Sequence, residues 1–177
     1  EASKYKEKMQ ELFSNVLFGK MFFAILSYIA LFFTVQLLHF DAEFSTLVYL
    51  SGVTMLFDSL HLTLYGALRA AGNLTYESYG IMGSQLLAMM LGLIFLSLDL
   101  PIIFLILAFT VASIVNILYA AHVVRRTCGL RLIPHYNKET FKLLSFVAIP
   151  FALAAIFGRA YSYIDVIFLK KMAGDAE

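Results

Sequence analysis

The sequence predicts an all-α membrane protein with about five transmembrane helices, and three observations lead to this fold class. First, 61% of the 177 residues are hydrophobic and only 14% are charged, whereas a soluble domain carries about 25% charged residues. Second, the apolar residues form continuous runs rather than the alternating pattern of membrane-spanning strands. Third, Lys and Arg gather in some of the segments between these runs and not in others, which is typical of helices with a fixed orientation.

Five apolar runs are long enough to cross a bilayer, because an α-helix needs about 20 mainly apolar residues to span the hydrocarbon core. Backbone groups find no water partners in lipid, so runs of this kind must be helical. The connections at 41–43 and 99–101 are short and acidic, and Pro101 suits the first turn of the helix that follows it. The spans that we predict are 16–40, 44–68, 79–98, 101–124 and 141–169.

Positive charge indicates which side of the membrane each connection faces. If the chain crosses five times, ten Lys and Arg residues fall on one side, and only Lys170 and Lys171 fall on the other. Short loops rich in Lys and Arg stay in the cytoplasm, so we predict a cytoplasmic N-terminal end. The basic connection 125–140 also suits the anionic inner leaflet of the bilayer. The ten residues are Lys4, Lys6, Lys8, Lys20, Arg69, Arg125, Arg126, Arg131, Lys138 and Lys142.

Polar residues within the spans mark functional sites by default, because charge is costly at membrane depth. Asp58 and His61 lie three residues apart in the second span, and Tyr65 follows one turn later on the same helix face. Asp58, Gln85 and Asn116 all lie roughly 10–15 Å from the cytoplasmic ends of their spans. This shared polar layer suits a water-filled cavity. It equally suits interhelical hydrogen bonds that only hold the helices together.

Arg159 lies deep in the fifth span, near or just beyond the bilayer centre. Its guanidinium stays protonated and presents a planar set of donors that matches phosphate or carboxylate. Tyr163 lies one turn further on, and Asp165 lies near the outer end of the span. An Arg159 that faces a cavity would bind an anionic headgroup. The alternative is a structural ion pair with Asp165 or with another helix.

The sequence contains no pattern typical of an enzyme or a metal site. It has a single cysteine, Cys128, and it lacks metal-ligand spacing, a Gly-rich phosphate loop and a nucleophile motif. We therefore expect a protein that is not an enzyme and that uses no metal or cofactor. We expect no nucleic acid on the basic connection either, since Leu130 and Leu132 alternate with Arg131, as in a segment that lies on a membrane surface.

Two stretches resemble a known family of membrane transporters. Residues 60–71, LHLTLYGALRAA, resemble the end of the fourth helix in polysaccharide or O-antigen flippases of the multidrug/oligosaccharidyl-lipid/polysaccharide (MOP) superfamily. Residues 146–177, FVAIPFALAAIFGRAYSYIDVIFLKKMAGDAE, look like the seventh helix of that family. There a proline near the start, an aspartate near the outer end and a Gly-Asp turn match Pro150, Asp165 and Gly174-Asp175.

The resemblance implies an internal part of a longer transporter with two lobes. Residues 1–124 would form four helices of a MOP/MATE-like N-terminal lobe, residues 125–140 the inter-lobe loop, and residues 141–177 the first helix of the second lobe. The remaining helices of the full-length transporter would complete the protein. This departs from the family pattern, because one lobe and a single further helix should not transport alone.

The resemblance also implies a function. A transporter of this family would flip an undecaprenyl-pyrophosphate-linked oligosaccharide across a bacterial or archaeal cytoplasmic membrane by alternating access. Arg159 would contact the pyrophosphate or acidic sugars, and Lys20 and Arg69 would play a lesser part at the cytoplasmic entrance.

Three other functions remain open. A cation-coupled multidrug exporter of the same superfamily needs an acidic residue deep in its first lobe, and Asp58 is the candidate for that role. A peptidoglycan-precursor flippase should carry more arginines in its cavity than this chain has. A membrane-embedded enzyme or assembly protein should show a polar catalytic cluster at the membrane interface, and none is visible in the sequence.

Overall fold

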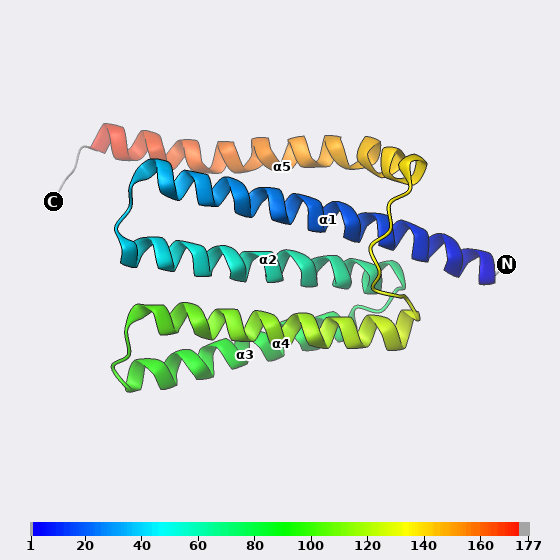
Figure 1. Ribbon diagram of the computed structural model, residues 1–177, viewed down its shortest axis with the longest axis horizontal. Coiled ribbons are helices and arrows are strands. Elements are labelled where there is room, and N and C mark those ends of the chain that lie inside the picture. The colour runs from blue at the N-terminus through cyan, green and yellow to red at the C-terminus, as the bar shows by residue number, and fades with distance from the viewer. Residues whose placement is uncertain (1, 174–177) are drawn as a thin grey trace. The chain divides into compact units, whose positions relative to one another are not determined.

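The computed structural model describes residues 2–173, with side chains for residues 7–161 and 164. Each of its five helices contains a stretch long and apolar enough to cross a membrane, and the described residues include no strand. The predicted all-α membrane fold with five helices is therefore confirmed. The helices are α1 (Ala2–Leu38), α2 (Ala42–Ala70), α3 (Thr75–Ser97), α4 (Ile102–Cys128) and α5 (Lys138–Ala173) (Figure 1).

The chain divides into two compact units, residues 1–136 and residues 137–177. The first unit contains α1 to α4, and successive helices in it run in opposite directions (Figure 1). One end of these four helices carries Arg69, Arg125 and Arg126 and is called the basic end below. The other end carries the two short turns with Asp41 and Asp99 and is called the acidic end.

Charged residues at the helix ends explain where several helices begin and end. Acidic residues stabilise the first turn of a helix and basic residues the last turn, because the helix dipole is positive at its N-terminus. Glu43 lies in the first turn of α2 and Arg69 lies in its last turn. After α4, Gly129 adopts a left-handed backbone with φ of 65°, a conformation that glycine reaches without steric cost and that commonly ends a helix.

Helix α1 begins well before the predicted span. Apolarity alone predicts the span at 16–40. The preceding residues, rich in Lys, Glu, Met and Gln, have high helix propensity and continue the same helix back to Ala2. Helix α4 likewise continues past the predicted span to Cys128. The described helices are thus longer than the segments that lie in the hydrocarbon core.

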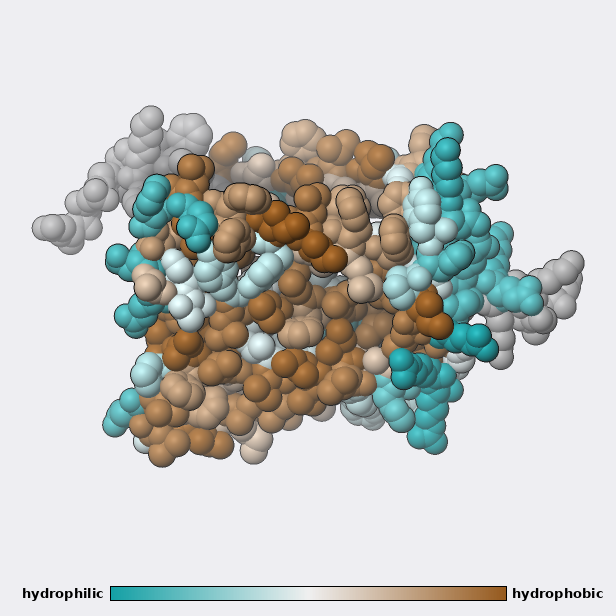
Figure 2. Space-filling model, viewed as in Figure 1, coloured by the Kyte–Doolittle hydropathy of each residue, from teal (hydrophilic) through white to brown (hydrophobic). Residues whose placement is uncertain are grey.

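Apolar side chains cover the outside of the first unit between its two ends. In Figure 2, hydrophilic residues gather at the ends of its helices and a broad hydrophobic band lies between them. Among the apolar side chains of this unit, Phe33, Leu37 and Met55 are 65%, 78% and 72% exposed. Such an apolar surface is stable only in contact with lipid or further helices.

The most closely packed part of the first unit lies near its basic end. Tyr65 and Leu68 of α2 and Val124 of α4 are completely buried there, and Phe13 and Leu17 of α1 pack into the same cluster. Helix α2 contacts each of the other three helices of the unit and packs most extensively on α4. Residues of α2 that face α4 are therefore well placed to form an internal site.

Candidate functional site

A row of polar side chains joins α2 to α4 inside the apolar band. The row on α2 recurs every three or four residues, so its members share one helix face. The Thr54 and Thr110 hydroxyls lie 2.7 Å apart. Closer to the basic end, the Ser113 hydroxyl donates a hydrogen bond of 2.6 Å to a carboxylate oxygen of Asp58.

The next pair in this row lies still closer to the basic end. The Tyr65 hydroxyl donates to the side-chain oxygen of Asn116 over 2.5 Å. Tyr65 is fully buried and Asn116 is 4% exposed, so each group depends on the other for a hydrogen bond. A Cβ atom added to Gly80 of α3 would overlap the Tyr65 hydroxyl and approach the Tyr119 ring to 2.9 Å. Glycine at this position therefore permits the Tyr65–Asn116 bond.

A cavity of about 300 Å³ lies beside this row, between α2, α3 and α4. Each of the three helices contributes two polar residues to it, and its remaining walls are apolar. The polar lining residues are Asp58, His61, Ser84, Gln85, Ser113 and Asn116. The structure thus places Asp58, Gln85 and Asn116, the three residues of the predicted polar layer, around one cavity.

Asp58 and His61 give the cavity its ionisable groups. The imidazole Nδ1 of His61 lies 3.5 Å from the same Asp58 oxygen that accepts from Ser113. The Asp58 side chain is 47% exposed, and that of His61 is 12% exposed. The cavity therefore offers hydroxyl, amide, imidazole and carboxylate groups, and its lining includes no Lys or Arg. This chemistry suits a ligand with many hydrogen-bonding groups, or a cation, better than it suits an anion.

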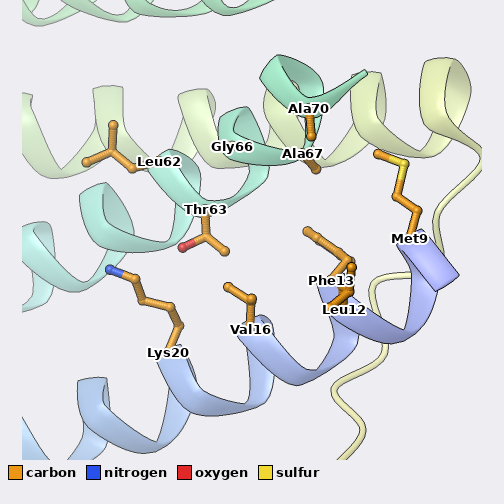
Figure 3. Close-up of a pocket in the computed structure, with 10 residues that line it drawn as sticks. All are labelled: Met9, Leu12, Phe13, Val16, Lys20, Leu62, Thr63, Gly66, Ala67 and Ala70. Carbon is orange, nitrogen blue, oxygen red and sulfur yellow. The ribbon is translucent and has the colours of Figure 1, made fainter. Parts of the chain in front are cut away.

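Lys20 lies on another side of α2, in the boundary between α1 and α2. Its ammonium points from α1 toward α2 (Figure 3) and donates a hydrogen bond of 2.9 Å to the Ser59 hydroxyl. No carboxylate lies within ion-pair distance of Lys20 among the described residues. Lys20 lines two largely apolar grooves of about 380 and 340 Å³, one toward each end of the helices. Its positive charge is thus available to an anionic ligand at membrane depth.

Arg69 is in a different position from Lys20. Its guanidinium Nε lies 3.0 Å from a carboxylate oxygen of Glu77, across the loop between α2 and α3. Glu77 is 13% exposed, whereas Arg69 is 49% exposed. This pair holds the start of α3 against the end of α2 at the basic end.

The remaining predicted site residues belong to the second unit. Arg159 lies in α5 and its side chain is exposed. The side chains of Tyr163 and Asp165 lie outside the described residues, and so does the Gly174-Asp175 turn.

Sequence reasoning did not single out Ser113, Ser84, Thr54 or Thr110. Serine and threonine are ordinary in membrane helices, where they can bond to their own backbone four residues back, as Thr54 and Thr110 also do. The signal that could have found Thr54, Thr110 and Ser113 is the repeat of three to four residues that they share with Asp58 on α2 or with Asn116 on α4; Ser84 follows no such repeat and lies next to Gln85 on α3.

The described residues contain no group of three or more His, Cys, Asp or Glu side chains that could hold a metal ion. The cavity brings Ser113, Asp58 and His61 together, with the Ser113 hydroxyl donating to Asp58 rather than to the imidazole. Its arrangement suits reversible binding of a polar group within the membrane.

The model of a protein family described as "Polysaccharide biosynthesis protein" matches residues 1–177. No curated protein and no solved structure matches the chain. The matched region includes the cavity, the Lys20 grooves and Arg159.

Proposed function

Because the chain belongs to the family of polysaccharide biosynthesis proteins, we propose that it forms part of a flippase that moves a lipid-linked oligosaccharide across the membrane. The observation that carries this proposal is the family match over the whole chain. The intramembrane cavity supports it, since a carrier of a polar headgroup needs polar groups at membrane depth, where they are otherwise costly. The proposed protein is a transporter that acts by alternating access, and it is not an enzyme.

The chemistry of the described residues suggests which of them would bind the sugar and which would bind the phosphate groups of the substrate. The cavity between α2, α3 and α4 has hydroxyl and amide groups and one carboxylate, so it suits sugar hydroxyls. The phosphate groups require cations. Lys20 suits that role because no carboxylate of the described residues neutralises it, and Arg159 suits it because it is an exposed guanidinium within an apolar helix. Arg69 is less suited, since Glu77 already pairs with it.

The proposed setting follows from the distribution of charge. The basic end would face the cytoplasm and the anionic inner leaflet, with the N-terminal end of the chain on that side. The membrane would be the cytoplasmic membrane of a bacterium or archaeon. The proposed partners are an undecaprenyl-pyrophosphate-linked oligosaccharide, the surrounding lipid and further helices of a longer transporter.

One feature favours a second candidate function, a cation-coupled multidrug exporter. Asp58 is a partly exposed carboxylate in an intramembrane cavity whose lining includes no Lys or Arg. A carboxylate in such a place can bind a proton or another cation. The two functions differ in their substrate. Loss of a flippase would leave the lipid-linked precursor in the cell, whereas loss of an exporter would leave the drug in the cell.

The test is complementation in cells that lack the transporter, with the protein expressed in its full natural length. The substitutions are Asp58→Asn and Arg159→Ala, and Asp99→Asn is the control. Asp99 lies in a turn with φ of 50°, which asparagine adopts readily, so the control should fold and export normally. Arg159→Ala should abolish export of surface polysaccharide, and Asp58→Asn should lower it about tenfold or more, equivalent to about 1.4 kcal/mol.

The measured quantities are surface polysaccharide, the lipid-linked precursor inside the cell and the amount of folded protein in the membrane. Accumulation of precursor with normal protein levels would support the flippase. Normal polysaccharide together with lost drug resistance would favour the exporter instead. Full export in both site variants would contradict the assignment of these residues.

A further inference from the structure

The segment between α4 and α5 follows one face of α1 instead of extending freely between the two units. Residues 129–137 have no helix or strand, yet Leu130 is only 4% exposed and packs into the cluster that contains Phe13, Leu68 and Val124. Leu132 packs against the same cluster. Burial of these two leucines fixes the first part of the segment to the first unit.

A glutamine side chain then holds the backbone of the segment. The Gln10 amide nitrogen donates to the backbone carbonyl of Arg131 over 2.9 Å, and the Arg131 backbone N–H donates to the Gln10 side-chain oxygen over 2.7 Å. This paired contact satisfies both backbone groups of Arg131 at once, as a neighbouring strand would. The Gln10 amide nitrogen also lies 2.8 Å from the Ser14 hydroxyl, to which it donates, so its orientation is fixed from both sides.

Two further contacts continue along α1. The His135 backbone N–H donates to the carbonyl of Ser14 over 3.3 Å, and the Tyr136 ring lies 5.3 Å from the Phe18 ring, centre to centre. Gln10, Ser14 and Phe18 are four residues apart, so they form one stripe on the helix. The segment is therefore held at its beginning, middle and end by a single face of α1.

The first residue of the second unit is held in a different way. The backbone N–H of Glu139 donates to the Asn137 side-chain oxygen over 3.0 Å, and that of Phe141 donates to the Asn137 carbonyl over 2.8 Å. Asn137 is thus the N-cap of α5 and belongs to that helix. The division between the two compact units falls directly between Tyr136 and Asn137.

We propose that residues 129–136 form a strap fixed to α1 through Gln10, and that movements between the two units pivot at the junction of Tyr136 and Asn137. A connection of this length could absorb motion along its whole extent if it were free. Fixing it to α1 confines the change of backbone angles to one junction, and any displacement of the basic end of α1 is passed directly to the start of α5.

Hydrogen exchange of the full-length protein in lipid nanodiscs tests the attachment. Gln10→Ala removes both bonds to Arg131, so exchange in the peptide that contains Arg131 and His135 should become about tenfold faster or more. Gln10→Glu can still accept from the Arg131 N–H but cannot donate to its carbonyl, so it should give an intermediate rate. The control is Gln36→Ala, because Gln36 lies on the same helix, is exposed, and makes no side-chain hydrogen bond within the described part of the chain. Unchanged exchange in both Gln10 variants, or equal acceleration in the control, would overturn the attachment.

Distances between spin labels test the pivot, in a Cys128→Ala background that removes the native thiol. Leu74, Ile133 and Leu143 are 58%, 60% and 60% exposed and so can carry labels. The pair Leu74→Cys with Ile133→Cys lies within the first unit and should give one narrow distance distribution. The pair Leu74→Cys with Leu143→Cys crosses the junction and should give a broader one.

Adding Gln10→Ala should broaden the first distribution. A broad first distribution with Gln10 present, or two equally narrow ones, would refute the pivot. These readouts require no transport activity, so they stand or fall independently of the proposed function.

Discussion

Two boundaries of the first unit, both formed by α2, are built in opposite ways. Against α4, α2 makes three interhelical hydrogen bonds through Thr54, Asp58 and Tyr65, and its facing residues are closely packed. Against α1, it accepts the hydrogen bond from Lys20 to Ser59, which lies between two grooves of about 380 and 340 Å³. Helices α2, α3 and α4 thus form a tight block. Helix α1 buries Phe13 and Leu17 near the basic end and Val35 nearer the acidic end, and the two grooves lie along its boundary with α2.

The difference indicates which part of the unit can change shape. A closely packed boundary with buried hydrogen bonds has few alternative arrangements, because each bond that opens leaves a polar group without a partner. A loosely packed boundary can change at lower cost, because few contacts are lost. We therefore expect α1 to move against the block of α2, α3 and α4, while the cavity inside the block keeps its geometry.

The largest effect on stability should come from Gly80→Ala, which disturbs the packing within the block of α2, α3 and α4. The added Cβ would collide with Tyr65 and Tyr119, so the free energy of unfolding should fall by about 1–3 kcal/mol, as for other overpacked cores. The measurement is unfolding in mixed micelles of increasing denaturing detergent.

The control for this change is Gly83→Ala on the same helix, where an added Cβ has no atom within 4 Å. Gly83→Ala should leave stability unchanged or raise it by up to about 1 kcal/mol. Equal stability of the two variants would mean that α3 is not held against Tyr65 as described.

A smaller effect is expected from separating the hydrogen-bonded pair Tyr65 and Asn116. A double-mutant cycle with Tyr65→Phe and Asn116→Ala should give a coupling energy of about 0.6–1.7 kcal/mol, the range found for bonds between membrane helices. The same cycle with Lys20→Met and Ser59→Ala should give a smaller value, because both residues of that pair are more accessible. A larger coupling for Lys20 and Ser59 than for Tyr65 and Asn116 would contradict the contrast between the two boundaries.

The smallest effects should come from two glycines of α2 near α1. An added Cβ at Gly66 meets nothing within 4 Å, and Gly66 lines one groove, so Gly66→Ala should raise the free energy of unfolding by up to about 1 kcal/mol. At Gly52 the Cβ would lie 3.2 Å from the Tyr28 ring and 3.3 Å from Leu31. Gly52→Ala should therefore raise the free energy of unfolding by less than Gly66→Ala does. A loss as large as that of Gly80→Ala would show that the α1–α2 boundary is as tightly packed as the block.

The sequence was sufficient to predict the five helices, because a bilayer sets both the length and the apolarity of a span. Simple depth arithmetic also predicted a shared layer for Asp58, Gln85 and Asn116, and the structure places all three around one cavity. That arithmetic works because neighbouring spans start at the same membrane surface, so equal distances along two helices correspond to equal depths.

What the sequence could not supply is which helices are neighbours and which faces meet. The pairing of Asp58 with Ser113 depends on α2 lying against α4, which is not its neighbour in the chain. The pairing of Gln10 with Arg131 depends on the path of an irregular segment. Spacing could place Ser113 on the same face of α4 as Asn116, but it does not indicate which helix that face meets. Composition and spacing gave no sign of the contact between Gln10 and Arg131.

The pairing of α2 with α4 also determines the order in which the protein can mature during synthesis. Asp58 and Ser113 are 55 residues apart in the chain, and a ribosome adding about 5–20 residues per second takes roughly 3–11 s to cover that distance. During this interval α2 holds a carboxylate at membrane depth, at a cost of about 2.5–3.5 kcal/mol on insertion scales. If α2 inserts as it is synthesised, Asp58 therefore lies in the bilayer before Ser113 has been synthesised. Its hydrogen bond to Ser113 forms only after α4 has been added.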